Sequence, residues 1–293
     1  MTEQSLGGLL RKGTELLKEA GIEEAGLDAW LLLEYIVQKN RSYFFAHQEE
    51  LVEDAAAEQY LKLLERRAQH IPVQHLTHQA FFMGYEFYVN DHVLVPRQDT
   101  ETLAEEAQKA LVGRENPRIL DMCTGSGCIL LSLLLDCAGS RGTGVDLSEK
   151  ALMTAKKNAE RLGVSDRAEF VHSDLFSADF FCKNSGNPQP EYDILVSNPP
   201  YIPTEDIESL MEEVRLHDPR MALDGKEDGL FFYREITRQA AQYLKKGGWL
   251  LYEIGYDQGE AVLAILKKEG YVNTEIKQDL CGLDRVVLGQ KAF

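Results

Sequence analysis

The chain has 293 residues, 44% of them hydrophobic and 27% charged, a balance typical of a globular protein of about two domains. Lys and Arg number 31 against 48 Asp and Glu, which gives a net charge of −17. Because nucleic-acid binding usually needs a basic surface, this charge disfavours a large nucleic-acid interface and favours a protein or small-molecule substrate.

No targeting, membrane or metal-binding feature is expected. The N-terminus lacks a basic start followed by an apolar run, and no apolar run approaches the roughly 20 residues that span a bilayer. The cysteines are scattered and form no C-x-x-C pair, which predicts reduced thiols of a cytoplasmic protein rather than a disulfide framework or a zinc site. They are Cys123, Cys128, Cys137, Cys182 and Cys281.

Residues 1–78 predict a small helical domain. Leucine and aromatic residues recur at helical spacing in three stretches. The first helix should end at Gly21, Asp28 is expected to cap the second, and residues 55–71 form the third. On these residues alone, a packing appendage and a partner-docking role are both open.

The segment 79–96 changes from helical to strand-like periodicity. Aromatic and β-branched residues alternate around Asn90-Asp91, which predicts a β-hairpin that ends at Pro96. We expect this hairpin to link the helical domain to a second domain, residues 97–293.

The second domain alternates short buried strands with helices. This pattern predicts an α/β fold, with a mostly parallel sheet covered by helices on both faces. The last two strands, joined through 281–284, should be antiparallel, and 182–191 should be a surface loop. The expected strands are 117–122, 142–148, 168–176, 192–198, 248–255, 271–279 and 285–292, and the expected helices are 127–139, 149–163, 228–246 and 258–270.

The stretch LDMCTGSGC runs from a strand that ends near Asp121 through Gly125-Ser126-Gly127 into a helix. Glycines let the backbone approach a ligand closely, and the helix N-terminus offers N–H groups. About 20 residues later Asp146 ends the next strand, where a carboxylate can accept both hydroxyls of a ribose. The dinucleotide fingerprint is incomplete because Leu130 replaces its third glycine, which disfavours a pyrophosphate and favours S-adenosyl-L-methionine. A plain βα turn is the alternative interpretation.

Asn198-Pro199-Pro200-Tyr201 follows the fourth expected strand. The prolines fix the backbone, so that the Asn198 side-chain oxygen and the Pro199 carbonyl can face one point. Two converging acceptors suit an –NH2 group, and Tyr201 offers a flat face for stacking. A rigid strand-end turn is the alternative.

Such a cradle suits methylation of an amide or aromatic amine. The nitrogen is a weak nucleophile, and hydrogen bonds to both its protons would direct its lone pair at a sulfonium methyl held about 3–3.5 Å away. No strong base is needed first, because the proton can leave after methyl transfer.

These motifs resemble a known family. LDMCTGSGC, GVDLS, SDLF and VSNPPYIP are similar to class I S-adenosyl-L-methionine-dependent methyltransferases, which have a Rossmann-like fold. The segments 71–103, 214–236 and 251–287 are similar to the peptide chain release factor N5-glutamine methyltransferase (PrmC/HemK) family. The resemblance covers nearly the whole chain, including the helical domain.

The resemblance implies methylation of the glutamine side-chain amide in the Gly-Gly-Gln motif of class I, bacterial-type release factors, the proteins of translation termination. It implies that residues 1–78 dock the release factor and that 97–293 form the methyltransferase domain. The implied cofactor-binding residues are Cys123, Thr124, Gly125, Ser126, Gly127, Asp146, Asp174, Leu175 and Asn198, and the implied catalytic residues are Asn198, Pro199, Pro200 and Tyr201.

Other functions remain open at this stage. A nucleic-acid N-methyltransferase is the main alternative, because a flipped base would suit the same cradle. A catalytically inactive cofactor-binding protein is a third. The family often has glycine where this chain has Cys123. Arg220 and Glu253 are interpreted as members of structural ion pairs.

Overall fold

The computed structural model describes residues 4–182 and 191–292. The chain divides into two compact units, one of Met1–Gln79 with Met211–His217, the other of Ala80–Leu210 with Asp218–Phe293. The first unit therefore includes a short stretch that the sequence interpretation placed in the methyltransferase domain. Most of the predicted loop at 182–191 lies outside the described residues.

The first unit is helical and has its own core. Tyr60 is fully buried and donates a hydrogen bond from its hydroxyl to the Ala29 carbonyl over 3.1 Å. A Cβ on Gly13 would lie 2.2 Å from that hydroxyl, so this crossing of the first and fourth helices requires glycine. The helices are α1 (Leu6–Glu19), α2 (Ala25–Val37), α3 (Arg41–Ala46), α4 (Asp54–Arg67), α5 (Val73–Thr77) and α9 (Glu212–His217).

The predicted capping role of Asp28 is wrong. The N-cap of α2 is Glu24, and Asp28 lies inside the first turn. Its carboxylate instead accepts a hydrogen bond from Arg67 over 2.7 Å, and the same guanidinium contacts Glu213 at 2.6 Å. An acid ahead of an apolar stretch looks the same in sequence whether it caps the helix or pairs with a buried arginine.

The hairpin predicted around Asn90-Asp91 is real but turns elsewhere. Its strands are β1 (Gln79–Phe82) and β2 (Tyr85–Tyr88). The turn residues Met83 and Gly84 have φ of 51° and 78°, the positive values that a tight two-residue hairpin loop requires. Asn90 instead accepts a hydrogen bond from the His92 N–H over 3.0 Å, which makes a local turn.

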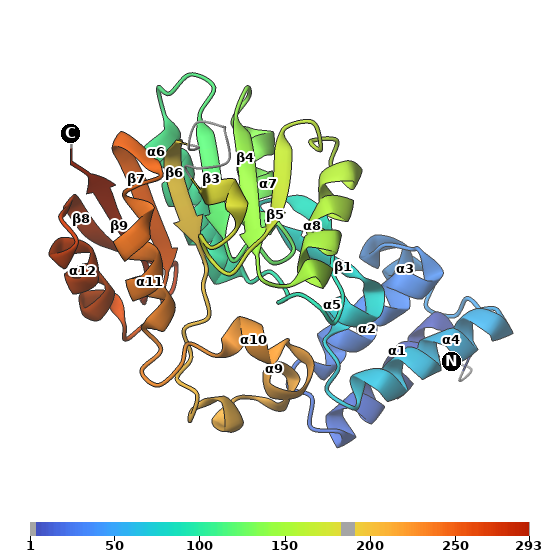
Figure 1. Cartoon of the computed structure of the whole chain (residues 1–293). Helices are drawn as coiled ribbons and strands as arrows, with labels where there is room; N and C mark the ends of the chain where they lie inside the picture. Colours follow the sequence, from blue (N-terminus) through green and yellow to red (C-terminus); the bar gives the residue numbers. More distant parts are fainter. Residues whose placement is uncertain (1–3, 183–190, 293) are drawn as a thin grey trace. The chain divides into compact units, whose positions relative to one another are not determined.

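The second unit contains a seven-stranded sheet in the order β5-β4-β3-β6-β7-β9-β8 (Figure 1). Strand β9 pairs antiparallel with both its neighbours and the other pairings are parallel, which confirms the predicted fold class. The strands are β3 (Arg118–Met122), β4 (Arg141–Asp146), β5 (Ala168–His172), β6 (Tyr192–Ser197), β7 (Leu244–Glu253), β8 (Tyr271–Gln278) and β9 (Asp284–Lys291).

Helices cover both faces of this sheet because its central strands are apolar on both sides. Ile119 packs in a core with residues of α6, α7 and α8, whereas the next residue, Leu120, packs in a second core with α11 and α12 (Figure 1). The helices are α6 (Glu101–Leu111), α7 (Cys128–Asp136), α8 (Glu149–Arg161), α11 (Phe231–Ala240) and α12 (Gly259–Lys268). The short elements are η1 (Gln98–Thr100), η2 (Asp179–Phe181), η3 (Ile207–Ser209) and α10 (Arg220–Leu223).

The strand register brings three predicted site residues to one edge. Met122 of β3 pairs with Val145 of β4 on one side and with Ser197 of β6 on the other. The residues that follow these positions are Cys123, Asp146 and Asn198, so they leave the sheet at the same level. Ligands of doubly wound folds bind outside this carboxyl edge, where the strand order reverses.

Candidate active site

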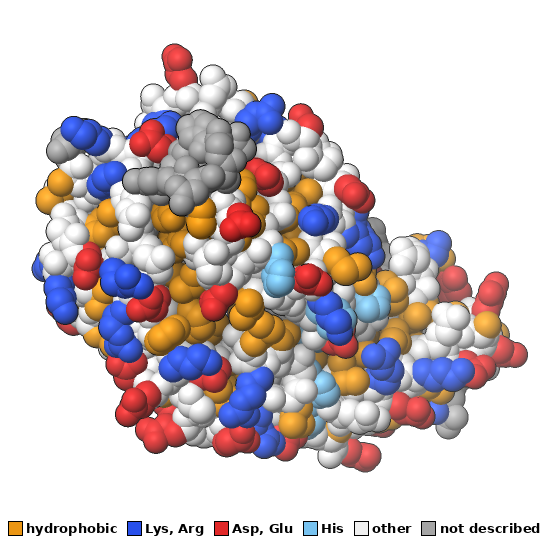
Figure 2. Space-filling view, viewed as in Figure 1, with side chains coloured by type: hydrophobic (Ala, Val, Ile, Leu, Met, Phe, Trp, Pro, Cys, Tyr) orange, Lys and Arg blue, Asp and Glu red, His pale blue; other side chains and the backbone are white. Residues whose placement is uncertain are grey.

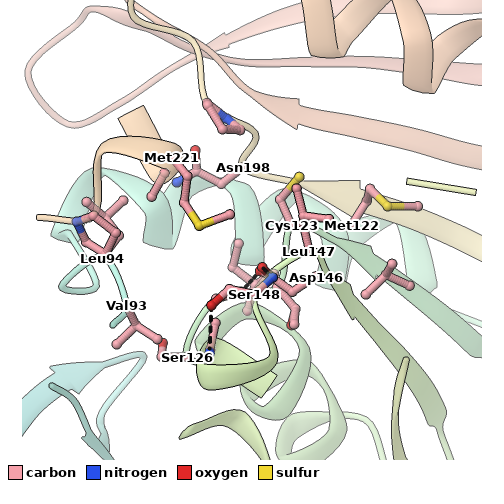
Figure 3. A pocket seen from close by; sticks show the side chains of 18 of the residues that line it. Val93, Leu94, Met122, Cys123, Ser126, Asp146, Leu147, Ser148, Asn198 and Met221 are labelled. Atoms are coloured by element: carbon pink, nitrogen blue, oxygen red, sulfur yellow. Dashed lines mark hydrogen bonds between the residues drawn. The ribbon is translucent and has the colours of Figure 1, made fainter. Parts of the chain in front are cut away.

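A cavity opens at the carboxyl edge of the sheet in the second unit. It is lined by residues of the β3–α7 turn, the β4–α8 turn, the segment after β5 and the segment after β6. Figure 3 shows Cys123, Asp146 and Asn198 arranged around it. Residues predicted from three separate motifs thus meet in one place.

The glycine turn is held in a fixed shape. Gly125 and Gly127 have φ of 55° and 80°, which side-chain-bearing residues rarely adopt. A Cβ on Gly127 would lie 3.2 Å from the Ala155 Cβ on α8, so glycine also permits close packing of the turn against that helix. Thr124 donates a hydrogen bond to the buried Asp121 carboxylate over 2.6 Å. Gly127 is not among the lining residues, and its structural role is conformational.

Asp146 is the last residue of β4 and faces the cavity. Its Oδ2 accepts the Gly125 N–H over 2.9 Å and its Oδ1 accepts the Ser148 N–H over 2.8 Å. Burial raises the pKa of this carboxyl, and these backbone hydrogen bonds oppose that shift. Each oxygen keeps acceptor capacity for a further donor, which fits the two hydroxyls of a ribose.

Three lining residues, Cys123, Leu175 and Lys226, hold left-handed backbone without being glycine. Cys123 has φ of 63° and Leu175 has φ of 50°. Such conformations cost roughly 1–2 kcal/mol and are common where a site dictates the backbone. The positive φ of Cys123 explains why related proteins often have glycine at this position. Burial, together with the charge of Asp146, raises the pKa of the Cys123 thiol, which therefore stays neutral and is a poor nucleophile.

The Asn-Pro-Pro-Tyr segment presents an amide to the cavity. Asn198 is half-buried, and its Nδ2 lies 3.4 Å from Thr100 Oγ1, to which it donates. This arrangement leaves Oδ1 to accept a hydrogen bond from a ligand. Pro200 also lines the cavity.

The other two members of that motif lie behind the cavity wall. Pro199 is buried, and neither it nor Tyr201 is among the residues that line the cavity. Tyr201 packs against the apolar core beneath α11 and α12, and its carbonyl accepts a hydrogen bond from Gln258 over 2.9 Å. Burial raises the pKa of its hydroxyl. The stacking role of Tyr201 stays a prediction.

Sequence reasoning missed several lining residues. The segment 92–96 was interpreted as strand, but Val93 and Val95 pack with Val89 and Ala151 in a small core of their own, and the segment borders the cavity. The spacing of residues in the sequence gave no indication that residues in the segment after β6 would line the cavity. The missed residues also include Thr100, Leu147, Ser148, Met221, Ala222, Lys226 and Phe232.

The two ion-pair interpretations have different outcomes. Arg220 pairs with Glu208 over 2.9 Å, as expected. Glu253 forms no ion pair within 4.0 Å with any residue that the structure describes, although its side chain is buried. The interpretation of Glu253 is therefore wrong. The sequence did hold a signal for a place near the site: Glu253 lies near the end of a predicted strand, as Ser197 does, and the carboxyl ends of parallel strands meet at one edge of the sheet.

Both parts of the chain match known protein families. Residues 8–77 match the PrmC N-terminal domain and residues 119–217 match a methyltransferase domain. A release factor glutamine methyltransferase of Caulobacter vibrioides is 40% identical over 94% of this chain and 92% of its own length. The chain belongs to the release factor glutamine methyltransferase family.

Further members of this family show similar coverage. The release factor glutamine methyltransferase of Bradyrhizobium diazoefficiens is 39% identical over 99% of this chain and 96% of its own length. A solved structure of a release-factor-specific protein-(glutamine-N5) methyltransferase from Alicyclobacillus acidocaldarius is 28% identical, covers 71% of this chain and 100% of that chain, and has a TM-score of 0.41. Its methyltransferase domain and its membership of this family make the chain an S-adenosyl-L-methionine-dependent methyltransferase, as its motifs predicted.

Proposed function

We propose that this protein transfers a methyl group from S-adenosyl-L-methionine to the side-chain amide nitrogen of the glutamine in the Gly-Gly-Gln motif of peptide chain release factors. The observation that carries the proposal is the pairing of two features in one cavity. Asn198, whose Nδ2 donates to Thr100, lines the same cavity as Asp146 and the glycine turn. Asn198 suits an –NH2 group, and Asp146 with the glycine turn suits a nucleoside.

The cofactor supplies an electrophilic methyl group on a sulfonium when it is bound. The protein's own part is to hold the acceptor nitrogen. Asn198 Oδ1 would accept one of its N–H bonds, and the carbonyl of Pro199, a residue that does not line the cavity, stays the predicted second acceptor; together they would keep the amide plane fixed. After the nitrogen has been alkylated it is cationic, and these two oxygens then bind it more strongly, because hydrogen bonds to charged groups are the stronger kind.

The helical unit fits a docking role for the release factor. Its match to the PrmC N-terminal domain model spans nearly all of α1 to α5. A small amide supplies little binding energy of its own, so contacts of a whole protein substrate would provide the orientation. A release-factor substrate would also be consistent with a cytoplasmic location.

Charge supports a protein rather than a nucleic acid as substrate. The net charge is −17, and on the face shown in Figure 2 basic and acidic side chains are intermingled rather than gathered into a basic stripe. A continuous basic track is what a phosphate backbone would require. Nor does any helix in the described ranges, 4–182 and 191–292, combine the length and apolar character needed to cross a membrane.

The direct test is methyl transfer from labelled cofactor. Release factor, the same factor with its Gly-Gly-Gln glutamine changed to alanine, ribosomal RNA and duplex DNA are each incubated with the enzyme. We expect label on the unaltered release factor alone. Label that persists on the altered factor, or that appears on nucleic acid in its place, would refute the proposal.

A further inference from the structure

A buried acid lies directly beside the amide-binding asparagine. Strands β6 and β7 are parallel and pair Ser197 with Tyr252, so the next residues, Asn198 just after β6 and Glu253 at the end of β7, are neighbours. Thr100, at the end of η1, is the third member of this cluster and lies 3.4 Å from the Asn198 amide nitrogen. Glu253 and Thr100 are each only 3% exposed. Thr100 and Asn198 line the cavity, and Glu253 lies behind them.

The carboxyl of Glu253 is poorly compensated for its burial. Its Oε2 has no hydrogen-bond partner in the described part of the chain. Burial raises its pKa to about 7, and hydrogen bonds from Thr100 and Asn198 and the positive charge of Arg285 only partly oppose that shift. An acid in this state gains or loses its proton near neutral pH.

The identity of the atom that Asn198 presents decides whether the site works. A carboxamide is nearly symmetric in shape, and a half-turn exchanges its acceptor oxygen for a donor –NH2. With the –NH2 outward, the site would oppose donor to donor and reject a glutamine amide. The half-buried Asn198 therefore needs neighbours that fix its orientation.

An ionised carboxylate fixes the direction of the hydrogen bonds because it can only accept them. Thr100 then donates its single O–H to Glu253, and its oxygen is left to accept from Asn198 Nδ2. We propose that Thr100 and Glu253 are positioning residues, which together turn the Asn198 amide oxygen toward the substrate nitrogen. A protonated Glu253 could donate to Thr100 instead, and the orientation of Asn198 would no longer be imposed.

Other charged and titratable groups also lie around Glu253. Arg285 on β9 stays cationic and contacts Asp279 at 3.1 Å and Asp99 at 3.4 Å. Burial raises the pKa values of Tyr201 and Tyr233, and that of Cys128 to about 12, so all three are neutral.

Titration of a second carboxyl near the site, that of Asp121, could produce a similar pH dependence. Burial also raises the pKa of Asp121 to about 7. A pH effect must therefore be assigned by comparison with a Glu253→Gln variant, in which Asp121 is unchanged.

The kinetic test uses isosteric changes in the full-length enzyme with release factor as substrate. We expect Thr100→Val and Glu253→Gln to lower kcat by roughly 5- to 150-fold, since one mispaired hydrogen bond costs about 1–3 kcal/mol, with cofactor affinity within about twofold of wild type. Thr100→Ser, which restores the hydroxyl, should recover most of the loss. The matched control is Thr237→Val, which removes another buried hydroxyl, bonded to Tyr252 over 2.9 Å.

A spectroscopic test does not depend on the substrate. The side-chain amide signal of Asn198, assigned by its loss in Asn198→Ala, should shift with pH in the wild-type enzyme, with a midpoint near the Glu253 pKa of about 7. This shift should vanish in Glu253→Gln and shrink in Thr100→Val.

The two tests separate this inference from the proposed function on which its kinetic part rests. If wild-type enzyme leaves release factors unmethylated, the proposed function fails, while the Asn198 titration still tests the positioning role. An Asn198 signal that is insensitive to pH, or is equally sensitive in Glu253→Gln, overturns the inference. So does wild-type kcat in Thr100→Val, or a loss that Thr100→Ser does not restore.

Discussion

Replacement of Asn198 by alanine separates a catalytic role from a structural one. The side chain is half-buried; it donates a hydrogen bond to Glu253 and a second one, to Thr100, that is long at 3.4 Å. Loss of the bond to Thr100, which joins neutral groups, should cost less than about 1 kcal/mol of folding stability. The prolines that follow and the hydrogen bond from Ser197 to the Met122 carbonyl, 2.6 Å, hold the backbone in place.

The effect on catalysis should be far larger. The substrate nitrogen becomes cationic as it is alkylated, so the lost bond is one to a charged group, which contributes about 1.5–3 kcal/mol. At 1.36 kcal/mol per factor of ten, kcat should fall roughly 10- to 150-fold. The loss should appear in kcat rather than in cofactor affinity, because the bond strengthens in the transition state.

The assay is single-turnover methyl transfer with enzyme in excess over release factor. Calorimetry with S-adenosylhomocysteine reports cofactor affinity, and thermal unfolding reports stability. Asn273→Ala is the control, because this exposed asparagine of β8 also makes a side-chain hydrogen bond, to Gln290 over 2.9 Å. A kcat within twofold of wild type, or a loss matched by cofactor affinity or melting temperature, would refute the amide-acceptor role.

Three further substitutions test cofactor binding by Asp146, the conformation of the glycine turn and the stability contributed by Asp193. Asp146→Asn should weaken cofactor binding about 10- to 150-fold in calorimetry, because hydrogen bonds from the ribose lose a charged acceptor; unchanged affinity would contradict the ribose role. Gly127→Ala should destabilise by at least about 1–2 kcal/mol in denaturant unfolding, and more than Gly163→Ala, which has φ of 70° but no neighbour within 4 Å, whereas the new Cβ at Gly127 meets Ala155 at 3.2 Å. Asp193→Ala should cost about 2–3 kcal/mol at neutral pH, since it leaves a backbone N–H and two basic side chains without their acceptor. These hydrogen bonds outweigh burial and lower the Asp193 pKa below 3.8, so its contribution is present above that pH and is lost as the pH falls from there through the folded value. A wild-type–variant gap in stability that does not narrow as the pH falls below 3.8 would contradict this reasoning.

Periodicity and turn chemistry in the sequence predicted the seven strands of the large sheet, the helices α7, α8, α11 and α12, and the two motifs, but not α6 or α10. Alternating buried strands and helices have one well-packed solution, a parallel sheet covered on both faces. Gly125 and Gly127 allowed the turn to be predicted, because a positive φ is set locally and glycine is the residue that adopts it most easily. The position of Asp146 beside this turn was also predictable, because the carboxyl ends of parallel strands lie along one edge of the sheet.

Local signals failed wherever a residue's role depended on a distant partner. The sequence around Asp28 is that of a helix cap, and only the fold brings Arg67 to it. Alternating valines near Val93 look like a strand, yet they pack on Ala151 beside the cavity. Glu253 and Thr100 are more than 150 residues apart in sequence. Tertiary packing alone decides that an acid is buried beside an asparagine, because desolvation and hydrogen-bond direction depend on all the neighbours of a group and not on its place in the chain.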